Sequence, residues 1–270
     1  MRRRLFALVY AAAALLSACT TSAPPAPRVP RLPEQDLRIN YDETSLFGDS
    51  AHALTDDRIS GFRLLTGKLP LYWGRYLCNN NPQYDLAPEE LDVFRRSGVK
   101  PIVILQPGQS TLSGGATEAL EAARCLKDKL DTLASEFLFP GDLMIFLDVE
   151  KGTQLSRAYL EALVSALQTS GVLSGDTRFG IYLSGGYSSD VRALINSEVA
   201  NGVPISTVWM ARYLKSCGPL PYWQENNIPE LGTINVSAEL WQYAEACHAD
   251  GSYAGASFDL DAVKPPTYAW

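Results

Sequence analysis

The stretch that decides the fold is Leu143-Met144-Ile145-Phe146-Leu147-Asp148-Val149-Glu150, an apolar run that ends in two acids one residue apart. Such a run is typical of a buried β-strand. Because strand side chains alternate between two faces, Asp148 and Glu150 should share one face. Two like charges held close together raise each other's pKa and require compensation. The pattern therefore favours an active site, although a strand that simply ends in solvent would also carry such acids.

Short apolar runs alternate with helical patterns on both sides of this stretch. We expect strands at residues 59–65, 71–77, 101–105, 143–150, 178–183, 206–213, 239–243 and 257–260. We expect helices at residues 87–97, 116–136, 155–169 and 188–197. Eight strands alternating with helices over about 220 residues predict an α/β fold with a parallel sheet, a (β/α)8 TIM-like barrel that is irregular in its first and last quarters.

The chain begins with the features of an export signal. Three arginines at positions 2–4 precede an apolar segment at residues 5–16, which is too short to span a bilayer. Leu16-Ser17-Ala18-Cys19 resembles the lipobox of bacterial lipoproteins, in which the cysteine becomes the lipidated first residue. The resemblance implies a signal peptide at residues 1–18 and several acyl chains on Cys19, enough for stable membrane anchoring. The alternative is an ordinary secretory peptide with an incidental cysteine.

Residues 19–40 are expected to form a linker. Five prolines lie between Thr20 and Pro33, with almost nothing to bury, which is typical of an extended, semi-rigid spacer. Residues 41–270 have the length of one barrel domain. The chain has 23 basic and 30 acidic side chains, a net charge of -7, and losing three arginines with the signal gives -10. This charge argues against nucleic acid as a partner and against electrostatic adhesion to anionic lipid.

Four cysteines remain in the exported part of the chain. An even number in an oxidising compartment predicts two disulfides, for which three pairings exist. Pairing Cys78 with Cys125 and Cys217 with Cys247 is favoured, because each bond would tie neighbouring loops. A zinc site is the competing interpretation, but the C-x-x-C spacing is missing and the only two histidines lie far apart in the sequence. No metal or organic cofactor is predicted.

Polar and aromatic side chains gather near the predicted strand ends, where barrel enzymes have their active sites. No Gly-x-Gly-x-x-Gly follows a strand, and neither a Gly-x-x-x-x-Gly-Lys-Ser/Thr loop nor a Gly-x-Ser-x-Gly elbow is present. Aromatic rings that stack on sugars, with carboxylates and amides that bind hydroxyls, favour a carbohydrate ligand. Core packing is the alternative for the tryptophans. The candidate binding residues are Arg75, Gln106, Tyr182, Trp209, Arg212, Trp241, Gln242, Tyr243, Asp259 and Asp261.

An ordered set of short motifs resembles glycoside hydrolase family 25, the barrel lysozymes. The set is Leu147-Asp148-Val149-Glu150, Gly180-Ile181-Tyr182, Val208-Trp209-Met210-Ala211-Arg212-Tyr213, Leu240-Trp241-Gln242-Tyr243 and Phe258-Asp259-Leu260-Asp261. The earlier stretches Gly74-Arg75-Tyr76-Leu77, Leu86-Ala87-Pro88-Glu89-Glu90 and Ser97-Gly98-Val99-Lys100-Pro101 are similar to a related group, the exported bacterial glycoside-hydrolase-like barrels of unknown function. The resemblance covers most of residues 59–263.

The resemblance implies that Glu150 is the general acid of a glycosidase. It implies that Asp148 assists, either by stabilising positive charge or by orienting an N-acetyl group of the substrate. Glycosidic hydrolysis needs one protonated and one ionised carboxyl close together. Same-face neighbours on a strand lie about 6.5–7 Å apart, which leaves retaining and inverting mechanisms both open.

One departure concerns the first strand. The related families place an aspartate near its end, after a glycine and an aromatic residue. With residues 59–65 as that strand, Gly61 and Phe62 are followed by Arg63. An arginine there would oppose an oxocarbenium-like charge or form an ion pair with Asp148.

Two functions from different classes follow. The first is hydrolysis of a cell-envelope glycan, with peptidoglycan as the expected carbohydrate partner and the membrane reached through the lipid anchor. The second is a non-catalytic glycan-binding or envelope-organising protein with a degenerate site, which Arg63 would favour. A barrel enzyme of other chemistry is a third interpretation, because fold does not fix function.

Overall fold

The computed structural model describes residues 45–135, 137, 139, 143–184, 189–213, 216–220, 234–248 and 257–264. The predicted signal peptide at residues 1–18, the lipidation of Cys19 and the linker at residues 19–40 lie outside the described residues. Within the described ranges, no helix combines the length and the apolar character that crossing a membrane requires.

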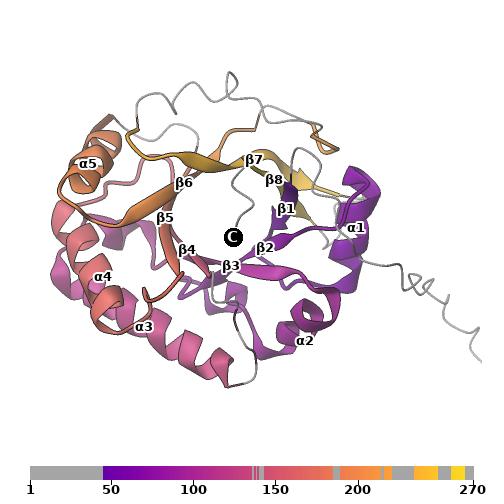
Figure 1. The fold of residues 1–270 in the computed structure, drawn as a ribbon, viewed down its shortest axis with the longest axis horizontal. Coiled ribbons are helices and arrows are strands. Elements are labelled where there is room, and N and C mark those ends of the chain that lie inside the picture. Colours follow the sequence, from indigo (N-terminus) through magenta and orange to yellow (C-terminus); the bar gives the residue numbers. More distant parts are fainter. Residues whose placement is uncertain are drawn as a thin grey trace, which may run out of the picture. The chain divides into compact units, whose positions relative to one another are not determined.

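Eight strands close into a barrel, seen down its axis in Figure 1. They are β1 (Ser45–Asp49), β2 (Tyr72–Leu77), β3 (Lys100–Leu105), β4 (Met144–Val149), β5 (Arg178–Leu183), β6 (Ile205–Ala211), β7 (Ala238–Cys247) and β8 (Phe258–Val263). Strands β1 to β7 pair in parallel in chain order. Strand β8 is antiparallel to both β7 and β1.

The prediction of a parallel sheet is therefore wrong at β8. A parallel pair needs a crossover of a dozen or more residues, usually with a helix, whereas only residues 248–257 separate β7 from β8. A connection of that length returns the chain in the opposite direction. The fold is a closed eight-stranded α/β barrel with one reversed strand.

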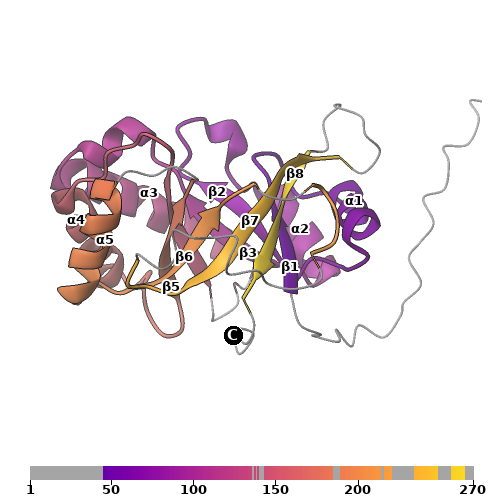
Figure 2. The same ribbon diagram turned by 90° about the horizontal axis from the view of Figure 1, so that it is seen from above.

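Five α-helices follow the first five strands in turn and lie outside the ring of strands (Figure 1). They are α1 (Asp56–Thr66), α2 (Pro88–Ser97), α3 (Ala116–Ala134), α4 (Arg157–Thr169) and α5 (Ser189–Ala200), with short 3-10 helices at η1 (Pro82–Tyr84) and η2 (Gln109–Ser113). Figure 2 shows the barrel from the side, with β7 and β8 slanting across it between α5 and α1. The predicted helices from residue 87 onward are confirmed within a few residues at their ends.

The expected strand at residues 59–65 is wrong, because this segment belongs to helix α1. The side chain of Thr55 caps the helix by accepting the Arg58 N–H at 3.2 Å, and Gly67 ends it in the left-handed conformation, φ 75°. Ile59 and Phe62 are buried at helical spacing, whereas Arg63 is exposed on the surface. The first strand lies earlier in the chain, at β1.

Strand β1 was missed because it is only five residues long and contributes two large apolar side chains, Leu46 and Phe47. It ends in Asp49, directly after Gly48. An aspartate therefore does close the first strand. The difference from the related families at Arg63 therefore disappears, because Arg63 does not lie on the first strand.

The barrel has an outer and an inner core. The outer core fills the space between strands and helices. The inner core fills the barrel itself with Phe47, Tyr72, Ile102, Ile104, Met144, Phe146, Tyr182, Trp209, Ala211, Leu240 and Val263. Two glycines make room for its largest rings: a Cβ at Gly74 would lie 3.0 Å from the Trp209 ring, and one at Gly180 would lie 2.5 Å from the Phe146 ring. The inside of the barrel is therefore packed.

Two disulfides connect the barrel to its surroundings, with the predicted pairing confirmed. Cys78, just after β2, is bonded to Cys125 on α3. Cys217, after β6, is bonded to Cys247 at the end of β7. Both bonds suit an oxidising environment.

The helix assignment of residues 56–66 can be tested by two substitutions. Replacing Thr55 by alanine removes the N-terminal cap of α1 and is expected to lower the free energy of unfolding by about 1 kcal/mol. Arg63→Ala should change it by less than about 0.5 kcal/mol, because that side chain is exposed. Urea unfolding followed by circular dichroism gives both values, and a larger loss for Arg63→Ala than for Thr55→Ala would contradict the assignment.

Candidate active site

Five carboxylic acids gather at the carboxyl end of the barrel, and we call them the acid cluster. Asp49 closes β1, Asp148 and Glu150 lie at the end of β4, and Asp259 and Asp261 belong to β8. Because β8 runs in reverse, its early residues reach the same end as the final residues of β1, and Asp259 pairs in register with Asp49. The reversed strand therefore delivers two of the five acids.

The acid cluster has a deep and a shallow level. Asp49, Asp148 and Asp261 are 3%, 1% and 0% exposed. Glu150 and Asp259 are half-buried. The shallow pair is therefore the more accessible to a ligand arriving from solvent, whereas the deep acids are held by hydrogen bonds within the protein on one oxygen or both.

Gln242 on β7 connects the two levels. Its Nε2 donates to Asp49 Oδ2 at 2.8 Å and to Asp259 Oδ2 at 2.7 Å. Its Oε1 accepts from the hydroxyls of Tyr182, at 2.7 Å, and Tyr213, at 3.3 Å. These four bonds use both amide hydrogens and both lone pairs. Gln242 is thus a crosslink within the site, and its predicted contact with substrate is corrected by this geometry.

Asp49 and Asp261 are a buried carboxyl pair. Burial raises the pKa of Asp49 to about 6, although hydrogen bonds from Asp261 and Gln242 act in the opposite direction. The pKa of Asp261 is raised well above its ordinary value by burial and then by the charge of Asp49. Each carboxyl affects the pKa of the other, and a hydrogen bond between two carboxyls requires one of them to be protonated. The other oxygen of Asp261, Oδ1, accepts the Trp209 Nε1–H at 2.9 Å.

Asp148 accepts a hydrogen bond from a side-chain amide. Gln106, at the end of β3, donates its Nε2–H to Asp148 Oδ2. Burial raises the pKa of Asp148 well above its ordinary value, and the charge of Glu150 raises it further. The protonated form of Asp148 is therefore favoured, and Glu150 contributes to this shift by its charge.

Gln109 fixes the backbone that follows Asp148. Its Oε1 accepts the Glu150 backbone N–H at 3.0 Å and the Thr153 hydroxyl at 2.6 Å, and its Nε2 donates to the Asp148 carbonyl at 3.3 Å. The described residues form no hydrogen bond with the Glu150 carboxylate itself. Glu150 is thus positioned by its main chain, with its side chain available at the rim.

Two tyrosines complete the rim. Tyr213, just after β6, is 44% exposed. Tyr76 on β2 is half-buried beside the inner core. Burial raises the pKa of Tyr76, and so do the charges of the acid cluster, from Asp49 first. Both phenols remain neutral hydrogen-bond donors, and Tyr213 offers a ring face to a ligand.

Arg75 lies elsewhere than predicted. It points to the outer side of β2, is 1% exposed, and forms a two-point ion pair with Glu90 of α2 at 2.7 and 2.8 Å. It also donates to the Ser50 carbonyl at 2.7 Å. Its bonds tie β1, β2 and α2 together, so Arg75 is unavailable to substrate.

The two tryptophans are core residues, and their predicted stacking on a sugar is corrected by their burial. Trp209 and Trp241 are both 0% exposed. Trp209 fills the barrel beneath the acid cluster, 5.2 Å from the Tyr182 ring and 5.4 Å from the Phe146 ring between centroids. Trp241 belongs to the outer core beside Tyr243.

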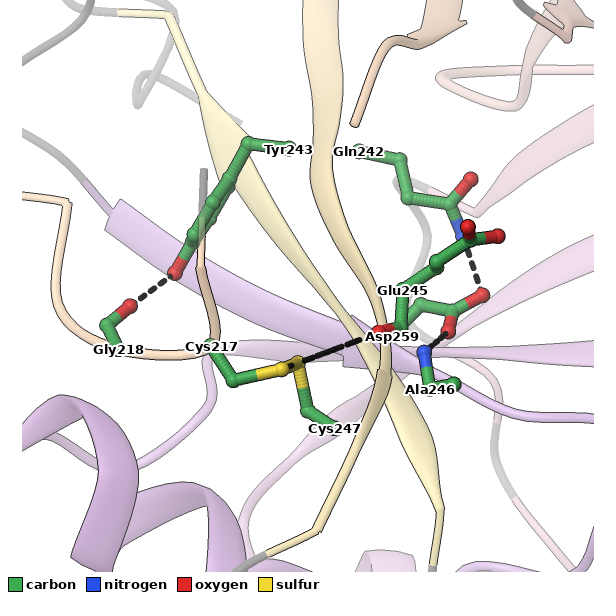
Figure 3. The surroundings of a disulfide bond; sticks show 8 residues. All are labelled: Cys217, Gly218, Gln242, Tyr243, Glu245, Ala246, Cys247 and Asp259. Atoms are coloured by element: carbon green, nitrogen blue, oxygen red, sulfur yellow. Dashed lines mark hydrogen bonds between the residues drawn. A yellow bond between two sulfur atoms is a disulfide. The ribbon is translucent and has the colours of Figure 1, made fainter. Parts of the chain in front are cut away.

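Arg212, Cys217 and Gly218 are bonded to residues of β7, which Figure 3 shows for Cys217 and Gly218. Trp241 Nε1 donates to the Arg212 carbonyl at 2.9 Å, and the Tyr243 hydroxyl donates to the Gly218 carbonyl at 2.8 Å. The Cys217–Cys247 bond adds a covalent link. Tyr243 is 0% exposed, so its predicted role in binding is corrected too. The side chain of Arg212 is half-buried, and its predicted contact with substrate stays a prediction.

Asp259 is the half-buried acid beside this disulfide (Figure 3). Its Oδ1 accepts the Ala246 N–H at 2.7 Å. Ala246 has a positive φ of 51°, in a stretch of β7 where the register with β8 shifts. The irregularity turns a backbone N–H toward the acid cluster. Even so, burial and then the charge of Asp49 raise the pKa of Asp259 well above its ordinary value.

Sequence reasoning missed Asp49, Tyr76 and Gln109. Strand alternation would select Tyr76 over Arg75 once the inner face of β2 is known. The signal for Asp49 was its place directly after a short apolar run and ahead of the Thr55 helix cap. Gln109 lies in a 3-10 helix, and no sequence pattern marks it.

The acid cluster is not arranged as a metal site. Among the residues that the structure describes, no three His, Cys, Asp or Glu side chains are placed to hold a metal ion. The arrangement instead suits proton transfer, with neutral carboxyls below and accessible acids above.

Comparisons with known proteins support the fold alone. No protein-family profile matches the chain, and no curated protein matches it significantly. Among solved structures, the chain is similar to the 1.07 Å crystal structure of an uncharacterized B. stearothermophilus protein, with a TM-score of 0.62 and 21% sequence identity. The similarity covers 82% of this chain and 96% of that one.

The shared proton of Asp49 and Asp261 predicts a pH effect on stability. Burial and then the charge of Asp49 raise the pKa of Asp261 well above its ordinary value of 3.8, so the folded state keeps a proton that the unfolded state loses. The stability that this proton contributes is full below about pH 4 and is lost as the pH rises through the raised pKa of Asp261. Asp261→Asn removes this titration, whereas Asp49 still titrates in both proteins. The free energy of unfolding of Asp261→Asn relative to wild type should therefore rise between pH 4 and pH 8.

Urea unfolding at several pH values measures this difference. The matched control is Asp128→Asn, an exposed acid on α3, for which the difference from wild type should stay flat. A flat difference for Asp261→Asn as well would contradict the shared proton.

Proposed function

We propose that the protein is an exported, lipid-anchored glycoside-hydrolase-like barrel that hydrolyses a cell-envelope glycan, with peptidoglycan as its substrate. The observation that carries the proposal is the pairing of a buried Asp148, whose pKa is raised, with a half-buried Glu150 at the carboxyl end of a barrel. Glycosidic hydrolysis requires two carboxyls in different environments. The ordered motifs that resemble the barrel lysozymes point to the same chemistry.

In this proposal Glu150 is the general acid that protonates the glycosidic oxygen. Its carboxylate reaches the rim, and Gln109 holds its backbone at 3.0 Å. Burial disfavours the charged form of Asp148, which argues against a role in stabilising positive charge. That favours the other role open to it, the orientation of an N-acetyl group on the substrate, because a protonated carboxyl can donate to a carbonyl oxygen.

The observation that favoured a non-catalytic, glycan-binding protein does not hold in the structure. It depended on Arg63 at the end of the first strand, whereas Arg63 lies on α1 and Asp49 ends β1. An aspartate at that position agrees with the pattern of the related families. The barrel itself is interpreted as a variant of the (β/α)8 fold in which the last strand is reversed.

Sugar recognition is assigned to the rim rather than to the tryptophans. Tyr213 has an exposed ring, and the half-buried Asp259 accepts hydrogen bonds on both oxygens from the protein while facing the rim. A ring that stacks on a sugar face beside carboxyls that bind hydroxyls is a typical carbohydrate site. A membrane tether would keep such a site close to the envelope polymer, and the two disulfides agree with export.

The release of reducing ends from purified peptidoglycan tests the proposal. Glu150→Gln should lower the rate by roughly 10²–10⁴-fold, the contribution typical of a general acid, with the thermal midpoint nearly unchanged. Glu121→Gln, an exposed glutamate on α3, is the matched control and should retain wild-type activity.

Three outcomes would count against this assignment. Equal activity of wild type and Glu150→Gln would exclude Glu150 as the acid. An inactive wild type that still binds peptidoglycan would favour a binding protein. A large drop in the thermal midpoint of Glu150→Gln would mean that this residue has a structural role.

The lipid anchor has a separate test. Cys19→Ser removes the thiol that would carry the acyl chains, so the variant should move from the membrane fraction to the soluble fraction of the envelope. Partition into detergent of wild type and variant, followed by mass spectrometry of the N-terminal peptide, measures this change. A wild-type N-terminus without acyl chains would contradict the proposal.

A further inference from the structure

A line of side-chain amides leads from the segment after β2 to Asp148. The Asn81 backbone N–H donates to Asn79 Oδ1 at 2.7 Å, and Asn79 Nδ2 donates to Gln106 Oε1. Gln106 Nε2 in turn donates to Asp148 Oδ2. We call Asn79, Gln106 and Asp148 the amide relay. Its members follow or end β2, β3 and β4, three neighbouring strands of the barrel.

The direction of the amide relay is fixed at its outer end. A backbone N–H can only donate, so the atom of Asn79 that faces Asn81 must be the carbonyl oxygen. Its amide nitrogen therefore faces Gln106, whose facing atom must be Oε1. The NH2 group of Gln106 is then left to point at Asp148. One backbone N–H thereby decides which face of the Gln106 amide the carboxyl meets.

The segment that carries Asn79 is held firmly in place. Cys78 is bonded to Cys125 of α3, and one turn further along that helix Lys129 pairs with Asp85 at 3.2 Å. The other oxygen of Asp85 accepts the Asn79 backbone N–H at 2.8 Å. Asn79 is only 7% exposed. A disulfide and an ion pair from the same face of one helix thus fix the starting point of the relay.

At its inner end, the amide relay forms a hydrogen bond with one carboxyl oxygen of Asp148 and none with the other. Oδ2 accepts from Gln106, whereas Oδ1 is buried and has no hydrogen-bond partner among the residues that the structure describes. Asp148 is 1% exposed and lies near Glu150 and Asp49, which disfavours its charged form. A neutral carboxyl with an accepting Oδ2 has its proton on Oδ1.

We propose that Asn79 is a positioning residue that acts through Gln106 to fix the Asp148 carboxyl, so that Oδ2 accepts a hydrogen bond and Oδ1 presents the proton. The inference rests on the proposed function in one respect, because in that function the Asp148 O–H is the group that orients the substrate carbonyl. The relay itself can be tested without any substrate.

The decisive variant is Asn79→Asp. The new side chain keeps its bond to the Asn81 N–H but can no longer donate to Gln106. The Gln106 amide should therefore turn over, donate to the new carboxylate at position 79 in place of Asp148, and present its oxygen to Asp148. Asp148 must then donate, which favours its protonated form further.

Two NMR readouts on the full-length protein follow this change. In wild type, the Gln106 side-chain NH2 protons should show nuclear Overhauser effects to the Asp148 Hβ protons, and in Asn79→Asp to the Hβ protons of residue 79. The carboxyl 13C titration of Asp148, assigned by its absence in Asp148→Asn, should move to higher pH. Asn80→Asp is the matched control, because Asn80 is exposed and touches the relay only through its backbone N–H on the Gln106 carbonyl at 3.1 Å.

A double-mutant cycle separates the relay from a simple charge effect. In a Gln106→Met background the amide is gone, so Asn79→Asp should move the Asp148 titration no further than Asn80→Asp does. A shift that persists undiminished in that background would overturn the proposal, because the added charge would then act through space. So would unchanged Overhauser effects in Asn79→Asp.

Activity on peptidoglycan gives an independent result. If the protein is a hydrolase, Asn79→Asp should lower kcat about tenfold with KM little changed, the pattern of a misaligned catalytic side chain. If wild type is inactive, the proposed function fails while the NMR readouts still decide the relay. If wild type is active and Asn79→Asp retains its kcat and pH profile, the positioning role is refuted.

Discussion

The whole carboxyl end of this barrel depends on one constraint: several carboxylic acids must be kept close together where water is scarce. Three of them are almost completely buried, and isolated buried charges are costly. The protein meets the constraint mainly with protons and side-chain amides. Asp49 and Asp261 share a proton, and Gln242 and Gln106 direct their NH2 groups at the carboxylate oxygens. Arg75, which lies behind Asp49, contributes its charge from the outer face of β2.

This constraint also explains why the amides are so fully used. Gln242 forms four hydrogen bonds, and Gln106 is fixed from both sides. An amide that is satisfied at both ends has one orientation, so each carboxyl meets a donor rather than an acceptor. The inner core lies beneath Gln242 and Gln106, and in it Trp209 packs against Phe146 and Tyr182. This packing supports the two amides rigidly. Packing, hydrogen bonding and protonation state therefore depend on one another.

Much of the fold could be predicted from the sequence, because long apolar runs and helical spacing indicate β2 to β7 and the helices from α2 onward. The even number of cysteines indicated two disulfides, and the favoured one of three pairings is the one observed. The first strand could not, since five residues with two large apolar side chains carry a weak signal beside a well-formed helix. The reversal of β8 depends on the length of its connection rather than on its own residues. In the site, Asp148, Glu150 and Gln106 lie at the strand ends where the sequence placed them, whereas Asp259 and Asp261 reach this end only because β8 is reversed. The sequence did not distinguish Arg75, Trp241 and Tyr243 from the residues of the site. Neighbouring strand residues point to opposite faces, and the sequence alone does not tell which face lies inward when the register is unknown.

The reversed last strand has a consequence for how the chain enters and leaves the barrel. Val263, at the end of β8, pairs with Ser45, at the start of β1. Both ends of the barrel domain therefore meet side by side at the amino end of the strands, a full strand length away from Asp49 and Asp259. The acids converge at the opposite end of the barrel, so the first and last strands meet at one end and bring their carboxyl groups together at the other.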